Sequence, residues 1–131
     1  MTLAALILVT IPVWTGTVVS VTDGDTLQVR VALWPQVTIE TAIRLLGVDT
    51  PETFRPKCDA ERVKGMEAKA LIVKLAPAGS VVSLSDVKAD KYGGRYDARI
   101  ETAAGVDLAT ALLEAKLAVP YGVKMDWCAA P

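Results

Sequence analysis

The sequence predicts a single α+β domain: a five-stranded, antiparallel β-barrel of the oligonucleotide/oligosaccharide-binding (OB-fold-like) type with two packed helices. Three observations predict it. Apolar and polar residues alternate in five short segments, as in half-buried strands. A longer segment after the third of these has apolar residues at helical spacing. The chain has 131 residues without an internal repeat or linker, a length that suits one small barrel domain.

The expected strands are joined by short connections. Asp23 and Gly24 form a pair typical of hairpin turns, and Pro35 lies in a second turn. The first three strands therefore form an antiparallel meander. A polar, glycine-rich loop separates the last two strands. The expected strands are residues 15–22, 26–33, 37–48, 81–87 and 96–101.

Two helices are expected, at 59–76 and at 107–115, and we expect no regular structure after the second. Asp59 and Asp107 are the residues expected to cap their N-termini. The side chains expected to face the core are Val63, Met66, Ala70, Leu71, Val73 and Leu75 in the first helix, and Leu108, Ala111, Leu112 and Ala115 in the second.

The N-terminal segment, residues 1–14, is apolar and is set apart from a domain at 15–131. An apolar helix needs about 20 residues to cross a bilayer, so we expect no stable membrane span. Two interpretations of the segment remain open at this point. One is an export signal, and the other is an apolar extension that leads into the first strand.

The composition excludes several kinds of site. The chain has no histidine, which excludes Ser-His-Asp and Cys-His catalysis and any zinc site that needs histidine. The formal net charge is −1, which is unusual for a general nucleic-acid-binding surface but allows a local basic pocket. Cys58 and Cys128 are free buried cysteines or a disulfide that fixes the C-terminal tail.

Two acidic motifs predict a cation site. Asp25 follows the first hairpin turn, and Asp49 follows the buried end of the third strand, so the two carboxylates are expected to share one cation. Arg44 precedes Asp49 in the same stretch, and its planar guanidinium suits a phosphate. Glu52 adds a further carboxylate. For each motif alone, an ordinary turn is the competing interpretation.

A third motif runs from Asp90 to Arg95 and contains two adjacent glycines, which allow the backbone to approach a ligand closely. Lys91, Tyr92 and Arg95 are able to donate hydrogen bonds to phosphate oxygens. A solvated hairpin loop is the competing interpretation of this motif alone.

The three motifs in this order resemble those of the staphylococcal nuclease (thermonuclease) family, and the resemblance extends from about residue 15 to Tyr121. It implies calcium-dependent hydrolysis of DNA and RNA with low sequence specificity, 3′-phosphate ends and a preference for single-stranded substrate. The alternative is a catalytically weak or inactive module that binds nucleic acid or protein on the same barrel.

The resemblance also implies a role for each matching residue. The implied catalytic residues are Arg44, Glu52 and Arg95, the calcium ligands are Asp25, Asp49 and the Thr50 carbonyl, and the substrate-binding residues are Lys91, Tyr92 and Tyr121.

The chain departs from the family in several places. Gly94 lengthens the third motif by one residue, and Lys116 stands where a helix-ending glycine is expected. We expect no counterpart of the family's long C-terminal helix after Tyr121, and we expect a Cys58–Cys128 disulfide to fix the tail in its place. The cysteine pair and the signal-like N-terminus together favour a secreted or periplasmic monomer.

Overall fold

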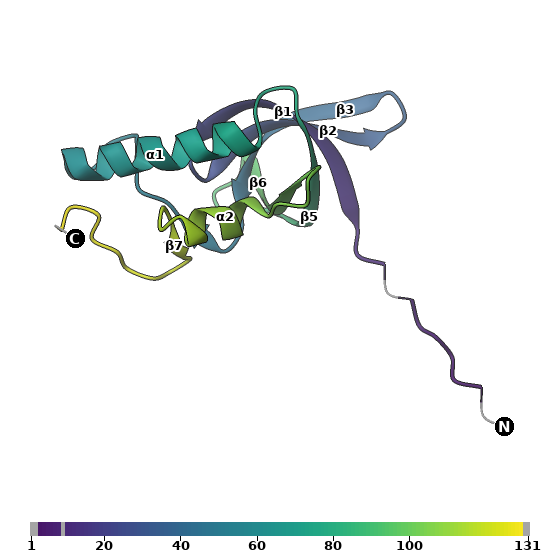
Figure 1. Ribbon diagram of the computed structural model, residues 1–131. Helices are drawn as coiled ribbons and strands as arrows, with labels where there is room; N and C mark the ends of the chain where they lie inside the picture. The colour runs from purple at the N-terminus through teal and green to yellow at the C-terminus, as the bar shows by residue number, and fades with distance from the viewer. Residues whose placement is uncertain (1–2, 9, 130–131) are drawn as a thin grey trace.

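A computed structural model of the chain describes residues 3–8 and 10–129, and it confirms the predicted barrel with two helices (Figure 1). The closed barrel has the strand order β1-β2-β3-β6-β5. Four of the pairings are antiparallel, and β3 pairs with β6 in parallel, so the barrel is mixed. The barrel strands are β1 (Val13–Asp23), β2 (Thr26–Trp34), β3 (Val37–Leu45), β5 (Val81–Ala89) and β6 (Arg95–Thr102).

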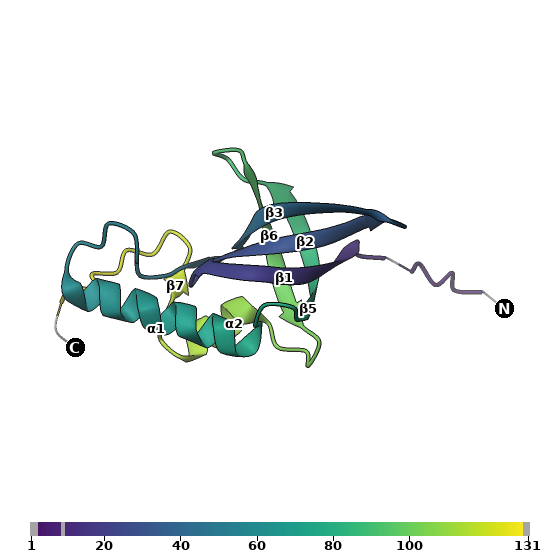
Figure 2. The same ribbon diagram turned by 90° about the horizontal axis from the view of Figure 1, so that it is seen from above.

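Two short strands and two helices lie outside the barrel. β4 (Val48–Asp49) pairs with β7 (Val119–Pro120), and this pairing brings the C-terminal tail beside the end of β3. Helices α1 (Asp59–Leu75) and α2 (Leu108–Glu114) lie next to each other beside the barrel (Figure 2). Alternate strand residues and a few helix residues form one buried core, which includes Val18, Leu27, Val29, Ile43, Leu45, Ile72, Leu84, Ile100, Leu108 and Leu112.

Two segments that reach the candidate site, the β1–β2 turn and the segment around Pro51, pack closely against α1. A Cβ atom on Gly24 would lie 2.7 Å from the Ala68 Cβ, so the β1–β2 turn packs directly on the helix. A Cβ atom on Gly65 would lie 2.8 Å from the Pro51 carbonyl oxygen. The segment around Pro51 therefore also rests on α1, because glycine and alanine leave room for its backbone.

The buried face of α1 differs from the predicted one. Val63, Met66, Ala70 and Val73 are exposed, while Leu71 and Leu75 are partly buried against the core. The buried residues of α1 are instead Glu61, Gly65, Ala68 and Ile72. Gly65 and Ala68 have little or no side chain, so backbone segments approach the helix closely there. Hydrophobicity alone does not predict this face, because only one of its four residues is a large apolar one.

Other predicted details also change. Cys58, rather than Asp59, caps α1, since its sulfur accepts a hydrogen bond from the Glu61 N–H at 3.4 Å. Asp107 caps α2 as predicted, but Ala115 follows that helix and is exposed. The third strand, expected over residues 37–48, ends at Leu45, because the chain turns there before it forms β4. The tail, expected to be irregular, forms β7.

Cys58 and Cys128 form the predicted disulfide, with their Cα atoms 6.0 Å apart. The bond links the tail after β7 to the N-terminus of α1. A crosslink between segments this far apart in sequence restricts the unfolded chain and holds the tail near the barrel.

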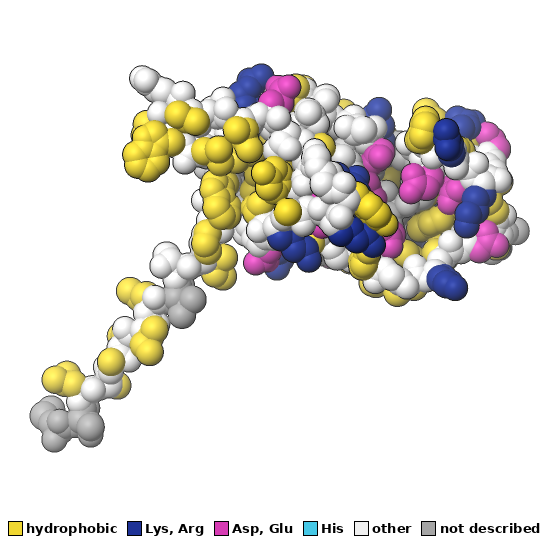
Figure 3. Space-filling model, turned by 180° about the vertical axis from the view of Figure 1, so that it is seen from behind, with side chains coloured by type: hydrophobic (Ala, Val, Ile, Leu, Met, Phe, Trp, Pro, Cys, Tyr) yellow, Lys and Arg dark blue, Asp and Glu magenta, His cyan; other side chains and the backbone are white. Residues whose placement is uncertain are grey.

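The apolar N-terminal segment lies partly outside the described residues, because residues 1–2 and 9 are not described. The first strand begins at Val13, two residues earlier than predicted. Residues 3–8 and 10–12 are exposed and extend away from the barrel, and Figure 3 shows hydrophobic side chains along this arm. Among the helices that the structure describes, none has the length and apolarity needed to cross a membrane.

Candidate functional site

A cleft of about 860 Å³ lies beside β3 and β6, between the β1–β2 turn and the β5–β6 loop. Every sequence-predicted site residue except Thr50 and the cysteines lines it. Thr50 is buried directly after Asp49. The charged and aromatic residues of the cleft wall are Asp23, Asp25, Arg44, Asp49, Glu52, Lys88, Asp90, Lys91, Tyr92, Arg95, Asp97 and Tyr121.

Arg44 occupies the centre of this polar cluster. One terminal nitrogen lies 2.7 Å from Asp49 Oδ1 and 3.6 Å from Asp25 Oδ2. The guanidinium also donates to the Leu45 and Val48 carbonyl oxygens at 3.2 and 3.1 Å. Only 15% of the Arg44 side chain is exposed, so these contacts fix the guanidinium where neighbouring strands end. Glu52 is not among these contacts of Arg44.

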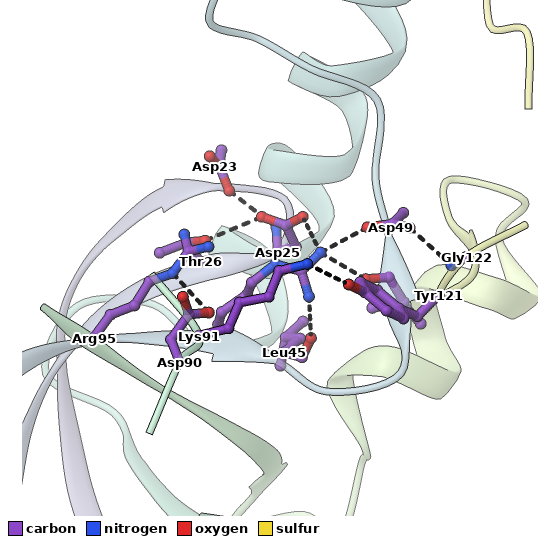
Figure 4. Close-up of polar contacts among 12 residues, drawn as sticks. Asp23, Asp25, Thr26, Leu45, Asp49, Asp90, Lys91, Arg95, Tyr121 and Gly122 are labelled. Carbon is purple, nitrogen blue, oxygen red and sulfur yellow. Dashed lines mark hydrogen bonds and ion pairs between the residues drawn. The ribbon is translucent and has the colours of Figure 1, made fainter. Parts of the chain in front are cut away.

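The β1–β2 turn supplies two carboxylates rather than one. Asp23 Oδ1 accepts a hydrogen bond from the Asp25 N–H at 3.2 Å, and Asp25 Oδ1 accepts one from the Thr26 hydroxyl at 3.0 Å (Figure 4). Burial, followed by the hydrogen bond and negative charge of Asp25, raises the pKa of Asp23 to about 7. The turn therefore brings two carboxyl groups to the cleft, of which Asp23 is partly protonated near neutral pH and Asp25 faces Arg44.

Glu52 follows Pro51 in the segment that rests on α1, and it lines the same cleft. Partial desolvation raises its pKa, and the negative charges of Asp25 and Glu61 act in the same direction. The positive charge of Arg44 acts against them. A carboxylate with a raised pKa is a stronger base than an ordinary one, which suits the removal of a proton from water.

Arg95 begins β6 and reaches the cleft from the side opposite Asp49 and Tyr121 (Figure 4). Its Nε atom lies 3.1 Å from Asp90 Oδ2. The loop that carries it is closed by the Asp90 N–H, which donates to the Arg95 carbonyl oxygen at 3.2 Å. Gly93 and Gly94 both have positive φ, at 75° and 74°, so the added glycine is accommodated within the loop and Arg95 still lines the cleft.

Lys91, Tyr92 and Tyr121 form one wall of the cleft. Lys91 Nζ lies 3.3 Å from the Tyr121 hydroxyl oxygen and 4.9 Å from the centre of the Tyr92 ring. A hydrogen bond to Tyr121, followed by one to Tyr92, raises the pKa of Lys91. The guanidinium carbon of Arg44 lies 5.6 Å from the Tyr121 ring centre.

The structure adds groups that sequence reasoning did not assign to the site. Asp23 was interpreted as a turn residue only, and Asp97 as part of a strand. The Gly122 N–H, from the tail, donates to Asp49 Oδ2 at 3.2 Å. Neither residue gives a local signal, because Asp23 is typical of a hairpin turn and Asp97 takes a polar position in the expected strand alternation. Nothing local indicates the Gly122 contact.

The donor set offers two carboxylates to a hard cation. Asp25 and Asp49 already lie within reach of the one positive charge of Arg44, and all donor atoms are oxygens, as Ca²⁺ prefers. No group of three or more acidic or cysteine side chains is arranged as a metal site among residues 3–8 and 10–129. A calcium ion here would complete its six to eight oxygen ligands with backbone carbonyls, water or substrate.

The comparisons with known proteins add no relative: no family model matches the chain, and a search of curated proteins finds no match.

Proposed function

We propose that the chain is a calcium-dependent phosphodiesterase that hydrolyses DNA and RNA with low sequence specificity. The position of Arg44 carries this proposal. A single guanidinium nitrogen lies 2.7 Å from Asp49 and 3.6 Å from Asp25, in a cleft that Glu52 and Arg95 also line. The proposed carboxylate ligands, the proposed phosphate-binding guanidinium groups and the candidate base therefore all come from residues that line this cleft.

The charge of the cleft supports a requirement for a cation. Asp49 and Asp25 lie 2.7 and 3.6 Å from the one guanidinium of Arg44, so carboxylates outnumber cationic groups at this point of the cleft. A nucleic acid is a polyanion, and an excess of negative charge here would repel its phosphates. A bound divalent cation would offset that excess.

Asp25 and Asp49 hold the calcium in this proposal, together with the Thr50 carbonyl oxygen. When bound, the ion offsets the negative charge of the phosphate and of the more highly charged transition state.

The protein's own groups perform the remaining tasks. Arg44 and Arg95 donate to oxygens of the scissile phosphate from two sides, and their planar forks orient it. Glu52 accepts a proton from the attacking water. Lys91 and Tyr92 contact the neighbouring phosphate, and Tyr121 packs on a base.

The substrate and products follow from the same arrangement and from the family resemblance. We propose cleavage that leaves 3′-phosphate ends, with single-stranded substrate preferred, because an unpaired base is free to stack on Tyr121. The disulfide suits an oxidising compartment, which supports the proposal of a secreted or periplasmic protein.

A nuclease assay with Ca²⁺, with Mg²⁺ and with chelator tests the proposal on denatured DNA, duplex DNA and RNA. We expect calcium-dependent release of oligonucleotides, fastest on denatured DNA, and none with chelator. Arg99→Ala is the control, since Arg99 is an exposed arginine on β6 that does not line this cleft. Absence of calcium-stimulated cleavage on all three substrates would refute the proposal.

One observation favours the alternative, a non-catalytic binding module on the same barrel. Both arginines already have carboxylate partners, Arg44 with Asp49 and Arg95 with Asp90, as in ion pairs that stabilise a fold. A gel-shift assay with chelator separates the two. Retention of single-stranded DNA without any cleavage in calcium supports the module.

A further inference from the structure

Asp97 lies in the cleft wall with an unusual environment. It sits on β6 opposite Arg44 of β3 and opposite Lys88 of β5. Its Oδ1 atom is buried and has no hydrogen-bond partner among the described residues. Buried polar atoms without a partner are rare in proteins because desolvation is costly, so this atom needs an explanation.

The Asp90 carboxyl group, which is close enough to Asp97 for a hydrogen bond when one of the two holds a proton, supplies the explanation. Both carboxylate oxygens of Asp90 already accept hydrogen bonds. Its Oδ1 accepts one from the Tyr92 N–H at 2.9 Å, and its Oδ2 lies 3.1 Å from Arg95 Nε. Two ionised carboxylates have no proton to donate to each other. One proton between them converts Asp97 into a donor and Asp90 into its acceptor.

The electrostatics agree on which group holds that proton. Burial, then the hydrogen bond to Asp90 and its charge, raise the pKa of Asp97. The backbone hydrogen bond from Tyr92 is the first cause that lowers the pKa of Asp90, and Arg95 also lowers it. Of the two, Asp97 therefore holds the shared proton to higher pH, and Asp90 keeps the charge that faces Arg95.

We propose that Asp97 is a positioning residue that shares one proton with Asp90 and thereby holds the Asp90–Arg95 pair in place at the edge of the cleft. This proposal rests on the proposed function for its effect on turnover, but not for its structural part. The linkage runs from Asp97 to Asp90, from Asp90 to the Arg95 Nε atom, and from the remaining guanidinium nitrogens of Arg95 to the phosphate.

The effect of pH follows from the groups that face Asp97. These are Asp90 from the loop, Lys88 on β5, Arg44 on β3 and Arg95 on its own strand. Helix α2 also packs on β6, and the charged group at its N-cap is Asp107. The Asp107 carboxylate lies 4.0 Å from the Arg99 guanidinium nitrogen on β6. When Asp97 loses its proton, Asp90 loses a donor and the cleft gains a negative charge. Both changes weaken phosphate binding by Arg95 as pH rises through the Asp97 pKa.

A measurement by NMR tests the structural part without any need for activity. Carboxyl ¹³C resonances of the full chain give the pKa values of Asp97 and Asp90, and the Arg95 Nε–H resonance reports whether the pair is held. We expect an Asp97 pKa above the ordinary aspartate value of about 3.9 and a change in the Arg95 resonance at that same pH. An Asp97 pKa at or below the ordinary value would overturn the proposal.

Two substitutions test the positioning role. Asp97→Asn keeps the shape and a donor for Asp90, so we expect a sharp Arg95 Nε–H resonance at every pH and turnover at or above that of the natural chain. Asp97→Ala removes the donor, so we expect a broadened resonance and a loss of about ten-fold in kcat, the scale of one hydrogen bond to a charged group. Glu101→Gln, an exposed charge on the same strand, is the control.

The outcomes separate the two proposals. A pH step in kcat/KM that coincides with the Asp97 pKa and disappears in Asp97→Asn supports the positioning role. Equal effects of the asparagine and alanine substitutions on the Arg95 resonance would overturn it. If the NMR results are as expected but no variant cleaves nucleic acid, the nuclease proposal fails and the shared proton stands.

Discussion

The Arg44 guanidinium lies 2.7 Å from the Asp49 carboxylate, although the two residues belong to different strands of different sheets. Arg44 is near the end of β3 in the barrel, and Asp49 is in the two-residue strand β4 that pairs with the tail. The ion pair therefore joins the barrel to the C-terminal segment. It also places a fixed positive charge at the position where the proposed reaction needs one.

The two arginines give the first prediction. A preorganised charge aimed at the transition state typically contributes ~10²–10³ in rate, so Arg44→Ala and Arg95→Ala should each lose about that factor in kcat. Lysine at either position should not restore the rate, because a point charge does not reproduce the planar fork. Steady-state kinetics give the kcat of each variant, with Arg99→Ala as the control. Near-normal turnover of Arg95→Ala would remove Arg95 from the proposed mechanism.

The calcium site gives the second prediction. Asp25→Asn removes one of the two proposed carboxylate ligands, so calcium affinity and nuclease activity should fall together. Titration calorimetry measures the affinity, and the nuclease assay measures the activity. Asp59→Asn is a matched control, because Asp59 pairs with Arg62 at the start of α1 and does not line the cleft. A calcium dependence that Asp25→Asn leaves unchanged contradicts the assignment.

The disulfide gives the third prediction. It closes a loop with a sequence separation of 70 residues, for which the chain-entropy model gives a stabilisation of roughly 4 kcal/mol. Cys128→Ser should lower the free energy of unfolding by about that amount in urea titrations. Cys58→Ser should lose slightly less, because a serine oxygen is a good helix cap in place of the Cys58 sulfur.

Two measurements check the disulfide result. The natural chain with reductant should unfold at the same urea concentration as Cys128→Ser. A thiol assay on the unfolded, unreduced chain should find no free thiol, since Cys58 and Cys128 are bonded to each other. Equal stability of the natural chain and Cys128→Ser would show that the bond does not contribute to stability.

The end of α2 gives the fourth prediction. Lys116 has a positive φ of 60°, and its N–H donates to the Leu113 carbonyl at 3.1 Å while the Leu117 N–H donates to the Leu112 carbonyl at 2.9 Å. This is the helix-ending arrangement in which glycine is favoured.

Lys116→Gly should therefore raise the free energy of unfolding by about 0.5–1 kcal/mol relative to Lys116→Ala, which keeps the strained backbone. Urea titration of the two variants gives the difference directly, and the alanine variant controls for the lost lysine charge. If the glycine variant is no more stable than the alanine variant, the left-handed backbone at this position is not strained.

The sequence by itself determined the elements whose signal is local. Strand alternation, the hairpin-turn signal near Gly24 and the Asp107 cap depend on neighbouring residues, so the bounds predicted for the barrel strands and α2 are close to the observed ones. The turn itself is one residue later than predicted, at Gly24 and Asp25, because Asp23 still pairs with Thr26. Lys116 stands where the sequence predicts a helix-ending glycine, and its backbone adopts the left-handed conformation that glycine favours. The motif pattern identified eight of the twelve charged and aromatic residues that line one cleft.

Only the tertiary structure decided which face of α1 is buried, where the tail pairs, and what Asp97 contacts. Val63 and Met66 are as apolar as Ile72, but the turn at Gly24 and the segment at Pro51 pack against small side chains on another face. The contact from Gly122 to Asp49 joins residues 73 positions apart. Contacts of this kind arise when the barrel closes and the disulfide fixes the tail, and no local pattern of residue types encodes them.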